Sequence, residues 1–271
     1  MERSFAAARA MMDKAGFKIL VPIKVSVDPQ LPFMGYTMPQ GGSFSIVVSG
    51  GSVGSGMLEG LLVHEMSHVY RMQTKHPSHN PRILGDAVDR VARIIPLVDY
   101  QQKILHDVLN DVQDLYADDI AFRVLRVAKA PFLKNVTEFL QSWVKDEPVN
   151  TKNALRNRWE NAGILVHNAR AIAQMRRHKV EDVGNRAVER NNKFLAGSPP
   201  EYDDGFRMFR NKMLYLREEF TVREFQVVLA EHLKEFILMV EIGLPNYESL
   251  ARRIGFRPPE PQGRILPSRS G

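Results

Sequence analysis

The stretch LLVHEMSHVY, residues 61–70, carries the pattern H-E-x-x-H inside an apolar run. The apolar flanks predict a buried helix, on which His64 and His68 are four residues apart and share one face. Their imidazoles can then bind one metal ion, and Glu65 between them can take a proton from a metal-bound water. The alternative is two ordinary histidines on a buried helix. Burying His68 without a partner would be costly, which favours the metal site.

The segments before this helix predict a small sheet. Residues 17–27 alternate in polarity and residues 43–49 (SFSIVVS) lie between glycine pairs, so both are expected to be strands. Prolines between them indicate a loop or hairpin. A short helix over residues 3–15 should precede the first strand, and a glycine-rich stretch over residues 49–56 should lead into the motif helix, expected at about 57–73.

The rest of the chain reads as helical. Thr221 is a plausible N-cap for the last long helix, with Glu224 at the capping-box position. Residues 76–81 and 198–205 are expected to be breaks or loops. The expected helices cover residues 86–95, 96–129, 131–145, 151–178, 180–196 and 221–241.

These elements predict an α+β fold that is mainly α, with a small antiparallel or mixed N-terminal sheet followed by helices. Residues 1–130 are expected to form the metal-binding catalytic region. Residues 131–257 should form a helical region that packs on the same cleft or stands apart from it. The proline-rich segment at 258–271 is expected to be a flexible tail.

The bulk composition is that of a globular protein, with 271 residues, 44% hydrophobic and 25% charged. Cysteine is absent, which excludes disulfides and thiolate metal ligands and fits a reducing compartment. No apolar run approaches the length of a membrane span, and the N-terminus lacks the apolar core of a signal peptide. A cytoplasmic protein without a membrane partner is therefore expected.

The net charge of +6 raises the question of a nucleic-acid partner. Arginines concentrate between residues 156 and 190, but acidic residues are interspersed among them. This mixture favours solvated helical faces, and no nucleic-acid fold signature accompanies the charge. Nucleic acid is therefore the less favoured partner.

A third metal ligand is expected from the helix that follows the motif. Asp107, Asp111, Asp114 and Asp118 follow helical spacing and form one acidic stripe. Acids opposite an apolar face are usually just solvated, but four aspartates in a stripe repel one another unless a cation offsets their charge. Asp119 interrupts the apolar side of the same helix.

Over about residues 43–122 the chain resembles the zincin metallopeptidases of the gluzincin type. In that family the helix after H-E-x-x-H carries E-x-x-x-D, and the segment DLYAD, residues 114–118, matches it with Asp in place of Glu. The resemblance implies that His64, His68 and Asp114 bind Zn2+ and that Asp118 orients a ligand histidine.

The resemblance also implies that Glu65 acts as general base in the hydrolysis of a peptide or protein substrate. The strand at residues 43–49 would be the sheet edge that binds the substrate, unless it is an ordinary interior strand. Aspartate is one methylene shorter than glutamate, so the third-ligand helix must approach more closely. Asp111, Asp118 and Asp119 remain rivals to Asp114.

Other histidines are less informative. His76 and His79 are expected to be surface-loop residues rather than a second metal site. The oxyanion-stabilising residue is not identified, and the residues considered for it are His167, His178, Tyr202 and His232. Two alternatives to a peptidase stay open: a non-proteolytic metal-binding interaction protein, and a nucleic-acid-associated protein that uses the basic helices.

Overall fold

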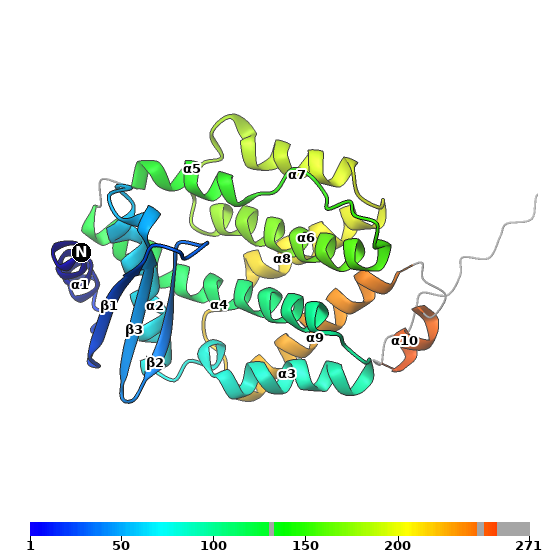
Figure 1. Cartoon of the computed structure of the whole chain (residues 1–271), viewed down its shortest axis with the longest axis horizontal. Coiled ribbons are helices and arrows are strands. Elements are labelled where there is room, and N and C mark those ends of the chain that lie inside the picture. Colours follow the sequence, from blue (N-terminus) through cyan, green and yellow to red (C-terminus); the bar gives the residue numbers. More distant parts are fainter. Residues whose placement is uncertain (130–132, 243–246, 254–271) are drawn as a thin grey trace, which may run out of the picture.

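A long helix, α4 (Asp99–Ala128), runs through the middle of the molecule and belongs to two hydrophobic cores (Figure 1). The computed structural model describes residues 1–129, 133–242 and 247–253. Leu105 and Leu109 in the first half of α4 pack in the larger, helical core. Ile120 and Val124 in its second half pack in a smaller core with the motif helix and the sheet. One helix therefore connects both parts of the fold.

The sheet is small and mixed, as the sequence predicted. It contains β1 (Ile23–Asp28), β2 (Gly35–Gln40) and β3 (Ser43–Ser49) in the order β1-β3-β2. β1 runs parallel to β3 and β2 runs antiparallel to it. Because β3 is the central strand, the expectation that residues 43–49 form the substrate-binding edge is wrong; β2 is the edge strand beside the motif helix. The first strand also starts later than expected, at Ile23.

The remaining described elements are helices, which confirms the mainly α character of the α+β fold. They are α1 (Glu2–Lys14), α2 (Leu58–Gln73), α3 (Pro81–Ile94), α5 (Leu133–Trp143), α6 (Ala154–Arg177), α7 (Arg186–Ala196), α8 (Glu201–Tyr215), α9 (Val222–Glu241) and α10 (Tyr247–Arg253). Short 3-10 turns lie at Gly50–Ser52, Pro77–His79 and Val183–Asn185.

Capping chemistry explains several helix starts. Thr221 and Glu224 form the predicted capping box at the start of α9. α3 begins earlier than expected because Asn80 caps it and Pro81 occupies its first turn. α8 begins at Glu201, inside the segment expected to be a loop, and acidic residues in its first turn suit the positive end of the helix dipole.

The helices on either side of the predicted domain boundary share one core. Residue 130 lies in the gap of the described chain, but α4 before it and α6 after it both contribute to the larger core, where Trp159 is fully buried. The predicted tail at 258–271 lies outside the described residues. Within the described ranges, no helix combines the length and apolar character needed to span a bilayer.

Candidate metal centre

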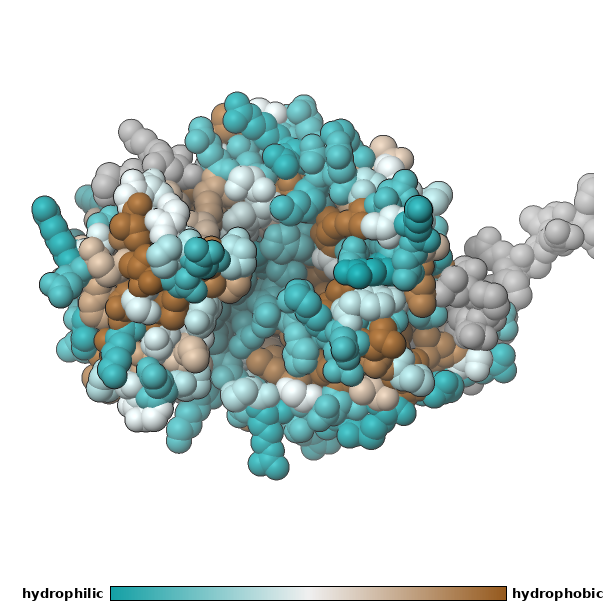
Figure 2. Space-filling model, in the orientation of Figure 1, coloured by the Kyte–Doolittle hydropathy of each residue, from teal (hydrophilic) through white to brown (hydrophobic). Residues whose placement is uncertain are grey.

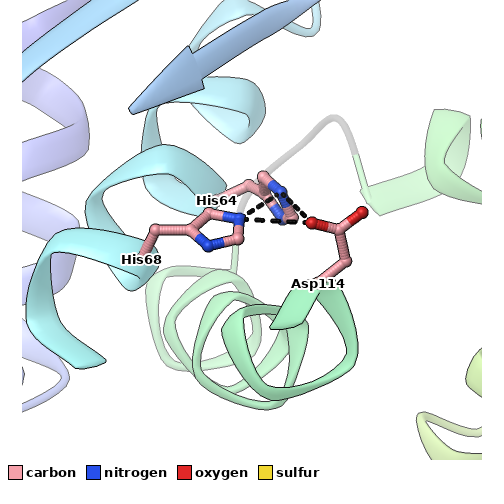
Figure 3. A group of neighbouring side chains, drawn as sticks. All are labelled: His64, His68 and Asp114. Atoms are coloured by element: carbon pink, nitrogen blue, oxygen red, sulfur yellow. Dashed lines mark hydrogen bonds and ion pairs between the residues drawn. The ribbon is translucent and has the colours of Figure 1, made fainter. Parts of the chain in front are cut away.

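The motif helix α2 presents its two histidines to a cleft because its opposite face is apolar. Leu62, Met66 and Val69 are fully buried in the smaller core. His64 and His68 lie on the other side of the helix and line the cleft. α4 passes beside them and contributes Asp114, so the two histidines and the aspartate face one another (Figure 3).

The distances within this group fit a zinc ion. His64 Nε2 lies 3.0 Å from His68 Nε2, and Asp114 Oδ1 lies 3.4 Å from His68 Nε2 and 4.0 Å from His64 Nε2. Tetrahedral zinc with ligand distances of 2.0–2.2 Å places its ligand atoms about 3.3–3.6 Å apart. The two imidazoles and one carboxylate are also a donor set that zinc prefers. These three residues could therefore hold a metal with modest adjustment.

Asp118, which the zincin resemblance expected to orient a ligand histidine, lies beside His64. Its Oδ1 is 2.6 Å from His64 Nδ1. The carboxylate accepts a hydrogen bond from Nδ1–H, so Nε2 is the ring nitrogen directed at the candidate site. Burial opposes the charge on this ring, but Asp118 raises the pKa of His64 to about 9.

A buried arginine, which the sequence analysis did not single out, lies behind the carboxylates. The Arg170 guanidinium of α6 is 2.8 Å from Asp111 Oδ1, 3.4 Å from Asp114 Oδ2 and 3.9 Å from Asp118 Oδ2. Burial opposes ionisation of Asp114, but the neighbouring guanidinium of Arg170 holds the pKa of Asp114 well below its usual range. The carboxylates outnumber this guanidinium, so a divalent cation would offset the excess negative charge.

The other aspartates of α4 considered for this role have other partners. Asp111 pairs with Arg170 and with His167, 2.9 Å away. Asp119 forms a two-pronged ion pair with Arg177, with distances of 2.7 and 2.6 Å, which explains why an acid interrupts the apolar side of α4. Asp107 is exposed and pairs with Lys103. Among the stripe, Asp114 is the carboxylate that joins the two histidines.

Glu65 is 4% exposed and held by the edge strand. The hydroxyl of Thr37 in β2 donates a hydrogen bond to Glu65 Oε2 at 2.7 Å. Gly35 permits this close approach, since a Cβ there would lie 3.0 Å from the Val47 carbonyl oxygen and 3.4 Å from Glu65 Oε1. Strand β2 therefore positions the carboxylate that the sequence assigned as general base.

A cleft of about 860 Å³ surrounds these residues. Figure 2 shows the molecule hollowed between its sheet-bearing side and its helical side. The edge strand β2 and α2 line one wall. Helix α5 contributes apolar lining to the same cleft, which includes Phe139, Leu140 and Trp143. An elongated ligand could therefore contact the candidate centre, the strand edge and an apolar surface together.

The expectation that His76 and His79 are surface-loop residues is wrong. They are 7% and 6% exposed, and His79 Nε2 lies 2.8 Å from His68 Nδ1. Burial lowers the pKa of both rings, and that of His79 lies well below its ordinary value. Their position depends on the 3-10 turn Pro77–His79, for which the sequence offers only a proline and a capping histidine as signals.

The residues considered as oxyanion stabilisers are engaged elsewhere. His167 pairs with Asp111, and His178 stacks on the Phe122 ring with centroids 4.1 Å apart. The Tyr202 hydroxyl donates to the Arg158 carbonyl, and His232 is buried in the helical core. None of the four is among the residues that line the described cleft.

Comparison with known proteins identifies a family without assigning an activity. No curated protein and no solved structure matches the chain significantly. A family model described as "Family of unknown function (DUF5781)" matches residues 2–238, and the chain therefore belongs to that family.

Proposed function

We propose that this protein is a zinc-dependent metallopeptidase that hydrolyses peptide bonds. The observation that carries the proposal is the convergence of His64 Nε2, His68 Nε2 and Asp114 Oδ1 in a cleft that Glu65 also lines. A zinc ion bound there would lower the pKa of its water toward neutrality and polarise a substrate carbonyl. The zincin resemblance of the sequence agrees with this assignment.

The chain's own residues supply the proton transfers in this proposal. Glu65 takes a proton from the attacking water and delivers it to the leaving amine, which makes it a general base and then a general acid. Thr37 orients the carboxylate from the neighbouring strand. Arg170 holds Asp114 ionised, and Asp118 keeps the hydrogen of His64 on Nδ1, away from the metal.

The form of the cleft supports an extended peptide as substrate. β2 is an edge strand whose free side can pair with an added strand, and residues 33–37 line the cleft. Helix α5 offers apolar surface for a side chain of such a peptide. The cytoplasmic location favoured by the cysteine-free sequence stays a prediction.

Two alternatives are less well supported. A non-proteolytic metal-binding protein has no need of the Glu65 carboxylate inside the cleft. A nucleic-acid partner would need free basic side chains, whereas Arg156, Arg158 and Arg190 pair with Glu160, Glu201 and Asp146. Binding to DNA or RNA that falls steeply with salt would favour the nucleic-acid alternative.

Metal analysis beside peptide hydrolysis tests the proposal. Purified wild type should carry about one zinc per chain and cleave members of a fluorogenic peptide library. His68→Ala should lose both properties, whereas Glu65→Gln should keep the metal and lose cleavage. His232→Ala, which removes a buried histidine that does not line the cleft, serves as control and should retain both. Zinc-free, folded wild type that gains no activity on zinc addition would refute the proposal.

A further inference from the structure

A line of hydrogen bonds joins His68 to a backbone carbonyl on the far side of the 3-10 turn. His68 Nδ1 lies 2.8 Å from His79 Nε2, and His79 Nδ1 lies 2.7 Å from Ser78 Oγ. Ser78 Oγ is also 2.7 Å from His76 Nδ1, and His76 Nε2 is 2.9 Å from the Glu218 carbonyl oxygen. The residues between the two ends are buried.

The carbonyl end fixes the direction of every bond in this line. A carbonyl oxygen only accepts, so His76 must donate from Nε2–H, and its Nδ1 is then a lone pair. Ser78 donates its hydroxyl hydrogen to that lone pair and accepts from Nδ1–H of His79. His79 Nε2 in turn accepts from Nδ1–H of His68. For neutral rings this is the arrangement in which all four contacts are hydrogen bonds.

We propose that His79 is a positioning residue that fixes His68 in its Nδ1–H tautomer, so that His68 Nε2 faces the metal as a lone pair. This proposal rests on the proposed function in that it takes His68 as a metal ligand. Without an acceptor at Nδ1, His68 could carry its hydrogen on Nε2 and donate to His64 Nε2, 3.0 Å away, in place of a metal.

The two ligand histidines are thus oriented by hydrogen bonds of different kinds. The Asp118 carboxylate orients His64, whereas a neutral line of two imidazoles and a hydroxyl orients His68. Because these imidazoles and the hydroxyl are neutral, they add no further negative charge to a centre already rich in carboxylates. The far end of this line is immobilised because the Glu218 side chain pairs with Arg71 of α2 and Arg123 of α4.

A tautomer measurement on metal-free protein tests the proposal independently of zinc and of activity. Long-range proton–nitrogen correlation spectra of 15N-histidine-labelled full-length protein should show His68 and His79 with hydrogen on Nδ1 and His76 with hydrogen on Nε2. In His79→Leu the His68 signals should lose this preference. His68 carrying its hydrogen only on Nε2 in the wild type would overturn the proposal.

Zinc affinity gives the second measurement, with variants that separate positioning from folding. His79→Leu should bind zinc about 10–100-fold more weakly than wild type. His79→Gln should recover part of the loss, since its amide oxygen can accept the same hydrogen bond. His232→Leu is the matched control because it removes an equally buried histidine outside the cleft.

The outcomes distinguish this proposal from the proposed function. Equal zinc affinities of folded His79→Leu and His232→Leu would overturn the positioning role and leave the peptidase assignment intact. Wild type that binds no zinc would refute the metal centre. The tautomer spectrum would then still test whether His79 fixes the tautomer of His68.

Discussion

The Nε2 atoms of His64 and His68 lie 3.0 Å apart, and each ring makes a hydrogen bond at Nδ1 on its far side that directs Nε2 toward the same point. Two lone pairs at this distance repel unless a cation or a proton lies between them. Asp114 adds a carboxylate to the same point from another helix. Helical spacing alone accounts for the shared face of the histidines, whereas the hydrogen bonds at Nδ1 account for the direction of their Nε2 atoms.

The position of Asp114 predicts which carboxylate completes the site. Loss of a residue that only hydrogen-bonds to a metal ligand weakens metal binding about 10–100-fold. Asp114→Ala removes a ligand itself and should weaken zinc binding by more than that. Asp107→Ala is the matched control, since it lies on the same stripe but is exposed and paired with Lys103. Competition with a fluorescent chelator measures both. Unchanged affinity in Asp114→Ala would transfer the role of third ligand to Asp111 or Asp118.

Arg170 should stabilise the metal-free protein more than the zinc-bound protein. Arg170→Met leaves three carboxylates without their buried guanidinium, which should lower the free energy of unfolding by about 3–5 kcal/mol. Zinc would offset part of the repulsion among the three carboxylates. Its addition should therefore raise the melting temperature of the variant more than that of wild type.

The control for this prediction is Arg177→Met, which breaks another buried ion pair, with Asp119, outside the metal group. It should lose stability without a larger response to zinc. Equal zinc-induced shifts in wild type and Arg170→Met would show that Arg170 does not compensate the charge of the site.

The sequence predicted those parts of the site whose residues lie close together along a single helix. His64 and His68 follow from helical periodicity, and the Asp118 contact to His64 follows the E-x-x-x-D resemblance. Arg170 could not be predicted because it lies on α6, whose packing against α4 depends on the whole helical core. The burial of His79 could not be predicted because it depends on how the turn at 77–79 packs, which local polarity does not reveal.

The sheet shows a similar division. The strand at 43–49 was evident from its β-branched residues between glycines, but its central position depends on pairing with strands before and after it. The region of β2 was expected only to be part of a loop or hairpin because of its prolines, among them Pro39. Proline is tolerated there because β2 is an edge strand, and Gly35 allows close approach to Glu65.

Ligand binding in the cleft should be visible in the fluorescence of one tryptophan. The chain has two tryptophans. Trp143 lines the cleft, with its ring 4.6 Å from the Arg170 guanidinium carbon, whereas Trp159 is fully buried in the helical core. Titrating zinc-loaded Glu65→Gln with an apolar peptide should therefore change the emission, and adding Trp143→Phe should abolish the change. A signal that survives in the double variant would place the peptide outside this cleft.

The buried His232 predicts a loss of stability in mild acid. Its ring packs edge-on to Phe209 in the helical core, and burial, followed by the charge of Lys212, lowers its pKa to about 4. In the unfolded chain His232 takes up a proton as the pH falls through about 6.5, whereas in the folded protein it stays neutral until about pH 4. The contribution of His232 to the free energy of unfolding is therefore fully present above pH 6.5 and is lost as the pH falls toward 4. The loss attributable to this histidine should be about 3 kcal/mol. Urea unfolding at several pH values should show that His232→Leu flattens this dependence, because leucine takes up no proton in either state. Parallel stability curves for wild type and variant would mean that His232 is protonated as easily in the folded protein as in the unfolded chain.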